Sequence, residues 1–160
     1  MRAIRCTGLF TAFFSIALSL PAVADDVTRT PLPKDHPLVG TWRIDVPRLQ
    51  CYEIYEIRPD GTTHVSSAKE RSESEFQISA EPSSKGFYQW VDKIVKDNGE
   101  PDCSGSIMEL GHVATNFIIV HPSGDKFLMC EEENLKSCLG PFVRLPDLLR
   151  VDSTSKCNAD

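Results

Sequence analysis

The chain has 160 residues, with 23 Asp and Glu against 17 Lys and Arg. A chain of this length fits one domain that buries a core of its own. The formal net charge of −6 argues against a nucleic-acid-binding function, because phosphate groups are bound by basic surfaces, and equally against binding to an anionic membrane.

Residues 1–24 have the three parts of a secretory signal peptide. Arg2 and Arg5 form a basic start, residues 6–20 carry no charge, and small residues at 21–24 provide a cleavage site. The uncharged run of about 15 residues is shorter than the roughly 20 that cross a bilayer, so we expect cleavage after Ala24 and no stable membrane anchor. The sequence therefore predicts an exported protein, periplasmic or extracellular, and removal of Arg2 and Arg5 would change the net charge from −6 to −8.

The rest of the chain consists mainly of short β-type segments. Residues 25–37 are polar and contain three prolines, which favours an extended lead-in. Beyond it, β-prone runs alternate with turn signals such as Pro59-Asp60-Gly61, which predicts a hairpin. The expected strands are 39–46, 52–57, 62–68, 75–80, 87–95, 107–110, 113–120, 126–130 and 142–145. Residues 147–160 form a polar tail, with one helical turn expected at 147–151.

Eight or nine short strands without a long helix indicate an all-β domain over residues 38–146. The segment 75–80 shows the clean alternation of a half-buried strand, whereas 87–95 is apolar on both faces. Such a pattern is typical of an antiparallel up-and-down β-barrel or of a β-sandwich. We expect the barrel, because closure removes the exposed sheet edges that an exported protein would otherwise carry.

Cysteine pairing should brace this domain. Cys51, Cys103, Cys130, Cys138 and Cys157 follow the expected cleavage site, and an oxidising compartment favours disulfides over metal ligation. Cys157 lies in the polar tail and is expected to be the odd thiol. The other four allow three connectivities, of which we expect Cys130 with Cys138 across a short loop and Cys51 with Cys103 across a long one.

The start and end of the domain carry a family resemblance. The stretch 38–42, Leu-Val-Gly-Thr-Trp, resembles the Gly-x-Trp motif that opens the first barrel strand of lipocalins and related calycins. The resemblance implies that Trp42 plugs one end of an eight-stranded barrel and that Arg144 packs over its indole ring. A guanidinium over an indole contributes about 0.5–2 kcal/mol. It also implies that the barrel binds a small apolar ligand.

Aromatic residues are the candidates for gripping such a ligand. The five expected ligand-binding residues are Tyr55, Phe76, Tyr88, Trp90 and Phe117. The alternative is that they fill a packed core, because an eight-stranded barrel is only just wide enough for one small ligand.

No catalytic or metal site is expected. The sequence lacks Gly-x-Ser-x-Gly, P-loop and Gly-x-Gly-x-x-Gly motifs, so we predict a non-enzymatic binding protein without a cofactor. His112 and His121 have opposite parity on one strand, which disfavours a shared metal, and Ser123 is expected to be a structural turn residue. The carboxylates of Glu53 and Glu56 are interpreted as solvated.

A protein-interaction role is the alternative function. The run 131–133 consists of three glutamates between Cys130 and Cys138, and a disulfide-braced acidic loop could enter a basic active site. The expected partner is thus a small apolar molecule or, in the alternative, an exported protein, as for an envelope enzyme inhibitor or immunity protein.

Overall fold

The computed structural model describes residues 27–146. The expected signal peptide, the helical turn at 147–151 and Cys157 lie outside these residues. Within them, no helix is long and apolar enough to cross a membrane.

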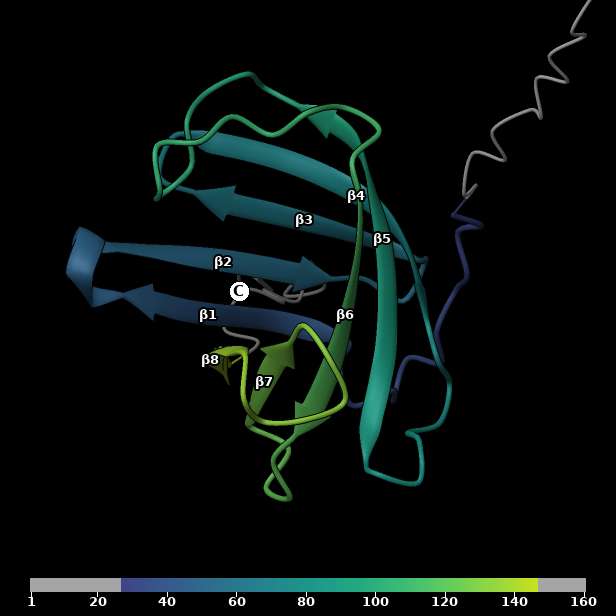
Figure 1. Cartoon of the computed structure of the whole chain (residues 1–160). Helices are drawn as coiled ribbons and strands as arrows, with labels where there is room; N and C mark the ends of the chain where they lie inside the picture. The colour runs from purple at the N-terminus through teal and green to yellow at the C-terminus, as the bar shows by residue number, and fades with distance from the viewer. Residues whose placement is uncertain (1–26, 147–160) are drawn as a thin grey trace, which may run out of the picture.

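Eight antiparallel strands follow one another around a closed barrel (Figure 1). The strands are β1 Gly40–Val46, β2 Cys51–Ile57, β3 Thr62–Ser67, β4 Glu70–Ile78, β5 Phe87–Asp97, β6 Val113–Val120, β7 Lys126–Cys130 and β8 Cys138–Arg144, and the 3-10 turn η1 Pro47–Leu49 joins the first two. Each strand pairs with the next, and β1 pairs with β8, where Trp42 lies opposite Arg144. The predicted all-β up-and-down barrel is confirmed.

Three strand predictions differ from the structure. β4 begins at Glu70 rather than at residue 75, because its first half places polar side chains inside the barrel and so lacks apolar alternation. Residues 107–110 form no strand and belong to the long connection between β5 and β6. β8 begins at Cys138, before the apolar run that marked it in the sequence.

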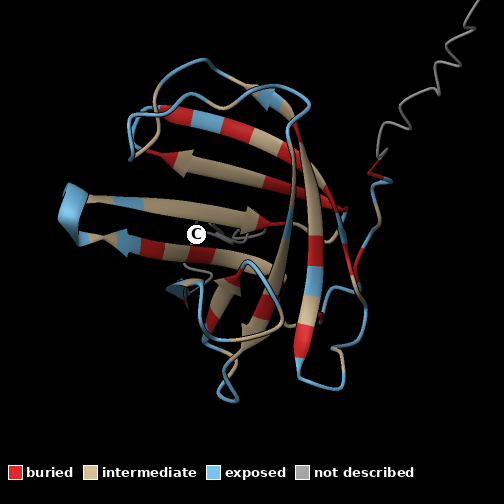
Figure 2. Cartoon of the chain, in the orientation of Figure 1, coloured by how far each residue is buried: buried red, intermediate tan, exposed pale blue. Residues whose placement is uncertain are grey.

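Apolar side chains fill one end of the barrel. Leu38, Trp42, Phe76, Ile118 and Phe142 are fully buried there, and Figure 2 shows buried and exposed bands alternating along β4 where the strand turns one face inward. Phe127 stacks on Phe142, with ring centroids 4.5 Å apart, and meets the Trp42 ring edge-on at 4.7 Å. We call this the closed end.

Trp42 and Arg144 complete the closed end. The indole Nε1 of Trp42 donates a hydrogen bond of 2.8 Å to the carbonyl of Leu38, and the guanidinium carbon of Arg144 lies 4.1 Å from the centre of the indole ring. Arg144 also donates to the backbone carbonyls of Pro37, Val39 and Gly124. One side chain therefore ties the last strand to the chain that enters β1.

The lead-in crosses the outside of the closed end. Its described residues, 27–37, form neither helix nor strand, but Thr30 donates its N–H to the carbonyl of Phe76 and Leu32 donates to that of Pro59, both at 2.9 Å. It runs along the right of Figure 1 toward β1. A Cβ on Gly61 would lie 3.0 Å from the carbonyl oxygen of Thr30, so glycine at this hairpin turn allows the lead-in to approach.

Candidate ligand cavity

The other half of the barrel interior contains a cavity of about 220 Å³. Its wall is formed by inward-facing residues of β2 to β7 and by the connection between β5 and β6. The lining residues are acidic (Glu53, Glu70, Asp92, Asp102), uncharged polar (Thr63, Ser72, Ser74, Asn116) and apolar (Tyr55, Val65, Trp90, Ile94, Met108, Ala114, Met129). The interior therefore changes from fully apolar at the closed end to largely polar around the cavity.

Three buried polar atoms in this wall have no hydrogen-bond partner within the described part of the chain. They are Oγ1 of Thr63, Oε1 of Glu70 and Nε1 of Trp90. The three residues are 1%, 4% and 2% exposed. A buried polar atom left unpaired costs about 1–3 kcal/mol, so a guest that pairs with these atoms gains this free energy on binding.

The acidic groups interact with one another. Burial first, and then the negative charges of Asp97, Asp102 and Glu53 together with a hydrogen bond to Asp97, raise the pKa of Glu70 to about 7. Burial also raises the pKa of Asp92 to about 6, against the effect of the Ser74 hydroxyl and of His112, which favour its charged form. Both carboxyl groups therefore titrate close to neutral pH.

A series of hydrogen bonds links the cavity wall to the segment between β5 and β6. The Glu53 carboxylate accepts hydrogen bonds from the Tyr55 hydroxyl at 2.9 Å and from the Ser67 hydroxyl at 2.7 Å. The Ser67 oxygen in turn accepts the N–H of Cys103 at 2.9 Å. Burial and Glu53 together hold the pKa of Tyr55 well above its usual value, so its hydroxyl stays a donor.

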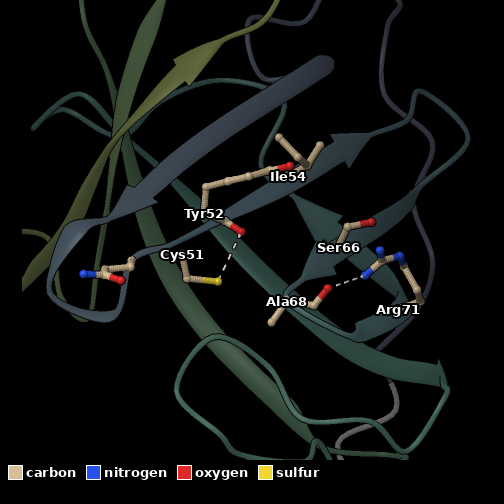
Figure 3. A pocket seen from close by; sticks show the side chains of 7 residues that line it. Cys51, Tyr52, Ile54, Ser66, Ala68 and Arg71 are labelled. Carbon is tan, nitrogen blue, oxygen red and sulfur yellow. Dashed lines mark hydrogen bonds between the residues drawn. The ribbon is translucent and has the colours of Figure 1, made fainter.

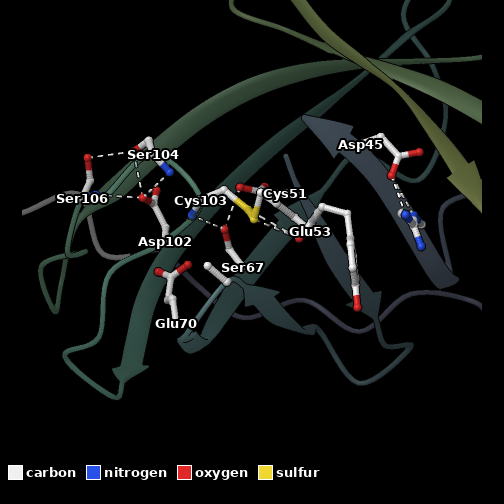
Figure 4. The surroundings of a disulfide bond; sticks show 12 residues. Asp45, Cys51, Glu53, Ser67, Glu70, Asp102, Cys103, Ser104 and Ser106 are labelled. Carbon is white, nitrogen blue, oxygen red and sulfur yellow. Dashed lines mark hydrogen bonds and ion pairs between the residues drawn. A yellow bond between two sulfur atoms is a disulfide. The ribbon is translucent and has the colours of Figure 1, made fainter. Parts of the chain in front are cut away.

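We call residues 98–112 the lid loop, because Asp102 and Met108 from it line the cavity. The loop lies at the top of Figure 1. The disulfide Cys51–Cys103 fastens it to the start of β2, and Figure 4 shows this bond beside Ser67 and Glu70. Inside the loop, Asp102 Oδ1 accepts the N–H groups of Ser104 and Ser106, both at 2.8 Å. Burial would raise the pKa of Asp102, but these hydrogen bonds outweigh it and lower the pKa.

Both predicted disulfides, Cys51–Cys103 and Cys130–Cys138, are present. They are consistent with an exported protein.

The five aromatic residues predicted to bind the ligand occupy different places. Tyr55 and Trp90 line the cavity. Phe76 lies below Trp90 in the closed end, 5.9 Å between ring centres, and Tyr88 packs against the core and meets the ring of His36 at 5.1 Å. Phe117 lies between the cavity-lining Asn116 and the fully buried Ile118 on β6, on the opposite face of the strand, and is not among the residues that line the cavity. β6 is apolar on both faces, and alternation alone does not decide which one turns inward.

The sequence interpretation also missed the acidic wall. Glu53 was interpreted as solvated together with Glu56, but the two face opposite sides of β2: Glu53 lines the cavity, and Glu56 pairs with Arg58 outside at 2.9 Å. Glu70, Ser72 and Ser74 escaped notice because the expected strand began after them. Continuing the inward parity of Phe76 and Ile78 back along the chain would have placed all three inside.

A second depression lies on the outer surface of the barrel. Tyr52, Ile54, Ser66 and Arg71 line it, and Figure 3 shows their side chains at the strands β2 and β3 and the turn after them. Arg71 donates to the carbonyl of Ala68 at 3.0 Å, so its charge is already engaged. None of the buried unpaired atoms found in residues 27–146 belongs to this depression.

Searches of protein-family models, curated proteins and solved structures found no significant match to the chain.

Proposed function

We propose that this protein is an exported, lipocalin-like binding protein that holds one small organic molecule in the barrel cavity and acts by binding rather than by catalysis. The sequence favours an apolar ligand. The polar half of the cavity wall favours a ligand that carries hydrogen-bonding groups beside its apolar part.

The observation that carries this proposal is the set of three buried, unpaired polar atoms on residues that line one cavity. Barrel interiors that serve only for packing are filled with apolar side chains, as the closed end of this barrel is. Here Thr63, Glu70 and Trp90 place hydrogen-bonding atoms where side chains do not pair with them. A ligand with complementary donors and acceptors would recover the cost of burying these atoms.

The apolar part of the wall supports the same proposal. Tyr55 and Trp90 offer aromatic faces, and Met108 and Met129 offer flexible thioethers that adapt to a bound shape. A concave wall that combines apolar surface with fixed polar groups is typical of small-molecule sites.

Ligand titration of two matched variants tests the proposal. Ala114 lines the cavity, whereas its neighbour Thr115 is exposed on the outer face of the same strand. We expect small-molecule fragments, detected by saturation-transfer NMR, to bind saturably to the native protein and to Thr115→Phe. Their binding should be lost in Ala114→Phe, because the new ring fills the cavity. Absence of saturable binding to the native protein, or equal binding to both variants, would overturn the proposal.

The braced acidic loop supports a second candidate, an inhibitor-like protein that binds a basic exported enzyme. The disulfide Cys130–Cys138 closes this loop, Glu133 is held by Lys85 at 3.4 Å, and Glu131 and Glu132 are exposed. Biolayer interferometry against basic secreted enzymes tests it. The candidate requires salt-sensitive binding that is lost in Glu131→Gln/Glu132→Gln and retained in Glu100→Gln, and it fails if the two glutamates are dispensable.

A further inference from the structure

We propose that the cavity selects a small organic cation, a protonated primary amine that also bears an aromatic ring with a hydrogen-bond acceptor. This inference rests on the proposed function and names the substrate class of the same site.

The wall of the cavity is acidic. Glu53, Glu70, Asp92 and Asp102 line the cavity, and none of the described lining residues is Lys, Arg or His. The cavity thus holds negative charge that no lining cation offsets. A bound ammonium group would be attracted by several carboxylates at once, in a site where burial weakens the screening by solvent.

Two buried oxygen atoms on the lining residues also favour an ammonium group. Glu70 is 4% exposed, and its Oε1 accepts no N–H or O–H group of the described residues; it faces the carboxylate of Asp97, with which it shares a hydrogen bond only when one of the two is protonated. Oγ1 of Thr63 also has no partner among the described residues. Both oxygens are acceptors, and an ammonium group brings three donors and no acceptor. An amine is therefore the group that satisfies both atoms and the local charge together.

Trp90 defines the rest of the ligand. Its Nε1 is the unpaired donor in the wall, so the ligand must present an acceptor to it. Its ring and that of Tyr55 provide aromatic surface, on which an aromatic group packs and to which a cation is attracted. A hydroxyaryl group joined to an amine would provide the acceptor, the aromatic ring and the positive charge that these residues favour.

A metal ion fits this wall less well than an organic cation. Within residues 27–146, no three His, Cys, Asp or Glu side chains converge as the ligands of one metal ion do. The carboxylates are instead distributed around a cavity of about 220 Å³, which suits a charge carried on a larger molecule.

Proton linkage gives the proposal a second readout. The pKa of Glu70, about 7, reflects burial and the facing carboxylates of Asp97 on β5, Asp102 on the lid loop and Glu53 on β2. Asp92, with its pKa of about 6, faces Ser74 on β4 and His112 on the lid loop. An ammonium group beside them would lower both pKa values, so binding near pH 6.5 should release protons and affinity should rise between pH 5.5 and pH 8.

Isothermal titration with three compounds of similar shape tests the inference. Tyramine is the cation, 4-hydroxyphenylethanol the neutral analogue, and 4-hydroxyphenylacetate the anion. We expect tyramine to bind about tenfold or more tightly than the alcohol, consistent with a charge-assisted hydrogen bond, and the acid not to bind.

Two substitutions locate the effect. Glu70→Gln keeps the side-chain shape and should weaken tyramine binding about tenfold while leaving the alcohol unchanged. Glu81→Gln removes one exposed charge from the connection between β4 and β5, outside the cavity lining, and should change neither. The proposal is overturned if the alcohol binds as tightly as tyramine, or if Glu70→Gln leaves tyramine affinity intact.

The outcomes separate this inference from the proposed function. If neutral compounds bind and are lost in Ala114→Phe without any preference for tyramine, the cavity binds ligands but the choice of a cation is wrong. If no compound binds in a manner that Ala114→Phe abolishes, both proposals fail.

Discussion

Glycine at position 40 is required by its contacts as much as by its backbone. Gly40 has φ +138°, and a Cβ placed on it would lie 2.5 Å from Nη1 of Arg144. The Gly-x-Trp motif thus leaves space for the guanidinium that lies over Trp42. The motif is recognisable in the sequence, but the reason for its glycine lies about a hundred residues away along the chain, at Arg144.

We expect Gly40→Ala to lower the free energy of unfolding by about 2–3 kcal/mol, from backbone strain and displacement of Arg144. Gly86→Ala is the control, because Gly86 has φ +86° and nothing within 4 Å of the added Cβ. That variant should lose about 1 kcal/mol. Equal losses by urea unfolding would show that the contact with Arg144 contributes nothing.

Glu70 should make the protein less stable as pH rises. Its folded-state pKa of about 7 lies above the ordinary value of 4.5, so folding favours the protonated form. The stability that it contributes is fully present below pH 4.5 and is lost as pH rises through 7. Glu70→Gln should therefore reduce the fall in unfolding free energy between pH 5.5 and pH 8 by about 2 kcal/mol.

Urea unfolding at the two pH values measures this effect, and Glu131→Gln controls for the change in net charge. An unchanged pH dependence in Glu70→Gln would mean that this carboxyl group does not titrate differently in the folded state.

The lid loop is the element that depends most on a covalent bond. Cys51–Cys103 closes a sequence separation of 52 residues, whereas Cys130–Cys138 closes one of 8. Chain entropy assigns about 4 kcal/mol to the first bond and about 2.6 kcal/mol to the second. Only the first also fastens a wall of the cavity.

Cys51→Ser/Cys103→Ser should therefore speed hydrogen exchange of lid-loop amides and raise the ligand dissociation rate, because Asp102 and Met108 lose their anchor. Cys130→Ser/Cys138→Ser should lower stability while leaving lid-loop exchange and dissociation unchanged. Exchange measured by mass spectrometry distinguishes the two, and similar lid-loop protection in both variants would contradict a tethering role for Cys51–Cys103.

The strands that lie on either side of a clear turn signal were predictable. β6 and β7 match the expected 113–120 and 126–130 at both ends. β4 was found only in its second half, because Glu70, Ser72 and Ser74 face inward while being polar. Prediction from sequence assumes that the inward-facing residues of a strand are apolar, and this assumption fails where the strand lines a polar cavity.

The barrel and its two disulfides could be predicted from the sequence, but the polar lining of half of its interior could not. The closed end follows the hydrophobic rule, and the motif at Trp42 marked it. The acidic wall around the cavity depends on which strands face each other across the barrel, which local spacing does not encode. Asp92 is one case: only its register with Phe76 on β4 and Ala114 on β6 places it inside.

The change from apolar to polar along the barrel axis separates the groups that fold the chain from those that would meet a guest. Ser72, Ser74 and Asn116 contribute wall around the cavity and take no part in the aromatic packing at the other end. Random replacement of these three positions should therefore yield mostly folded proteins with different ligand preferences. The ligand preference of this barrel could therefore be redesigned without changing the residues that stabilise its fold.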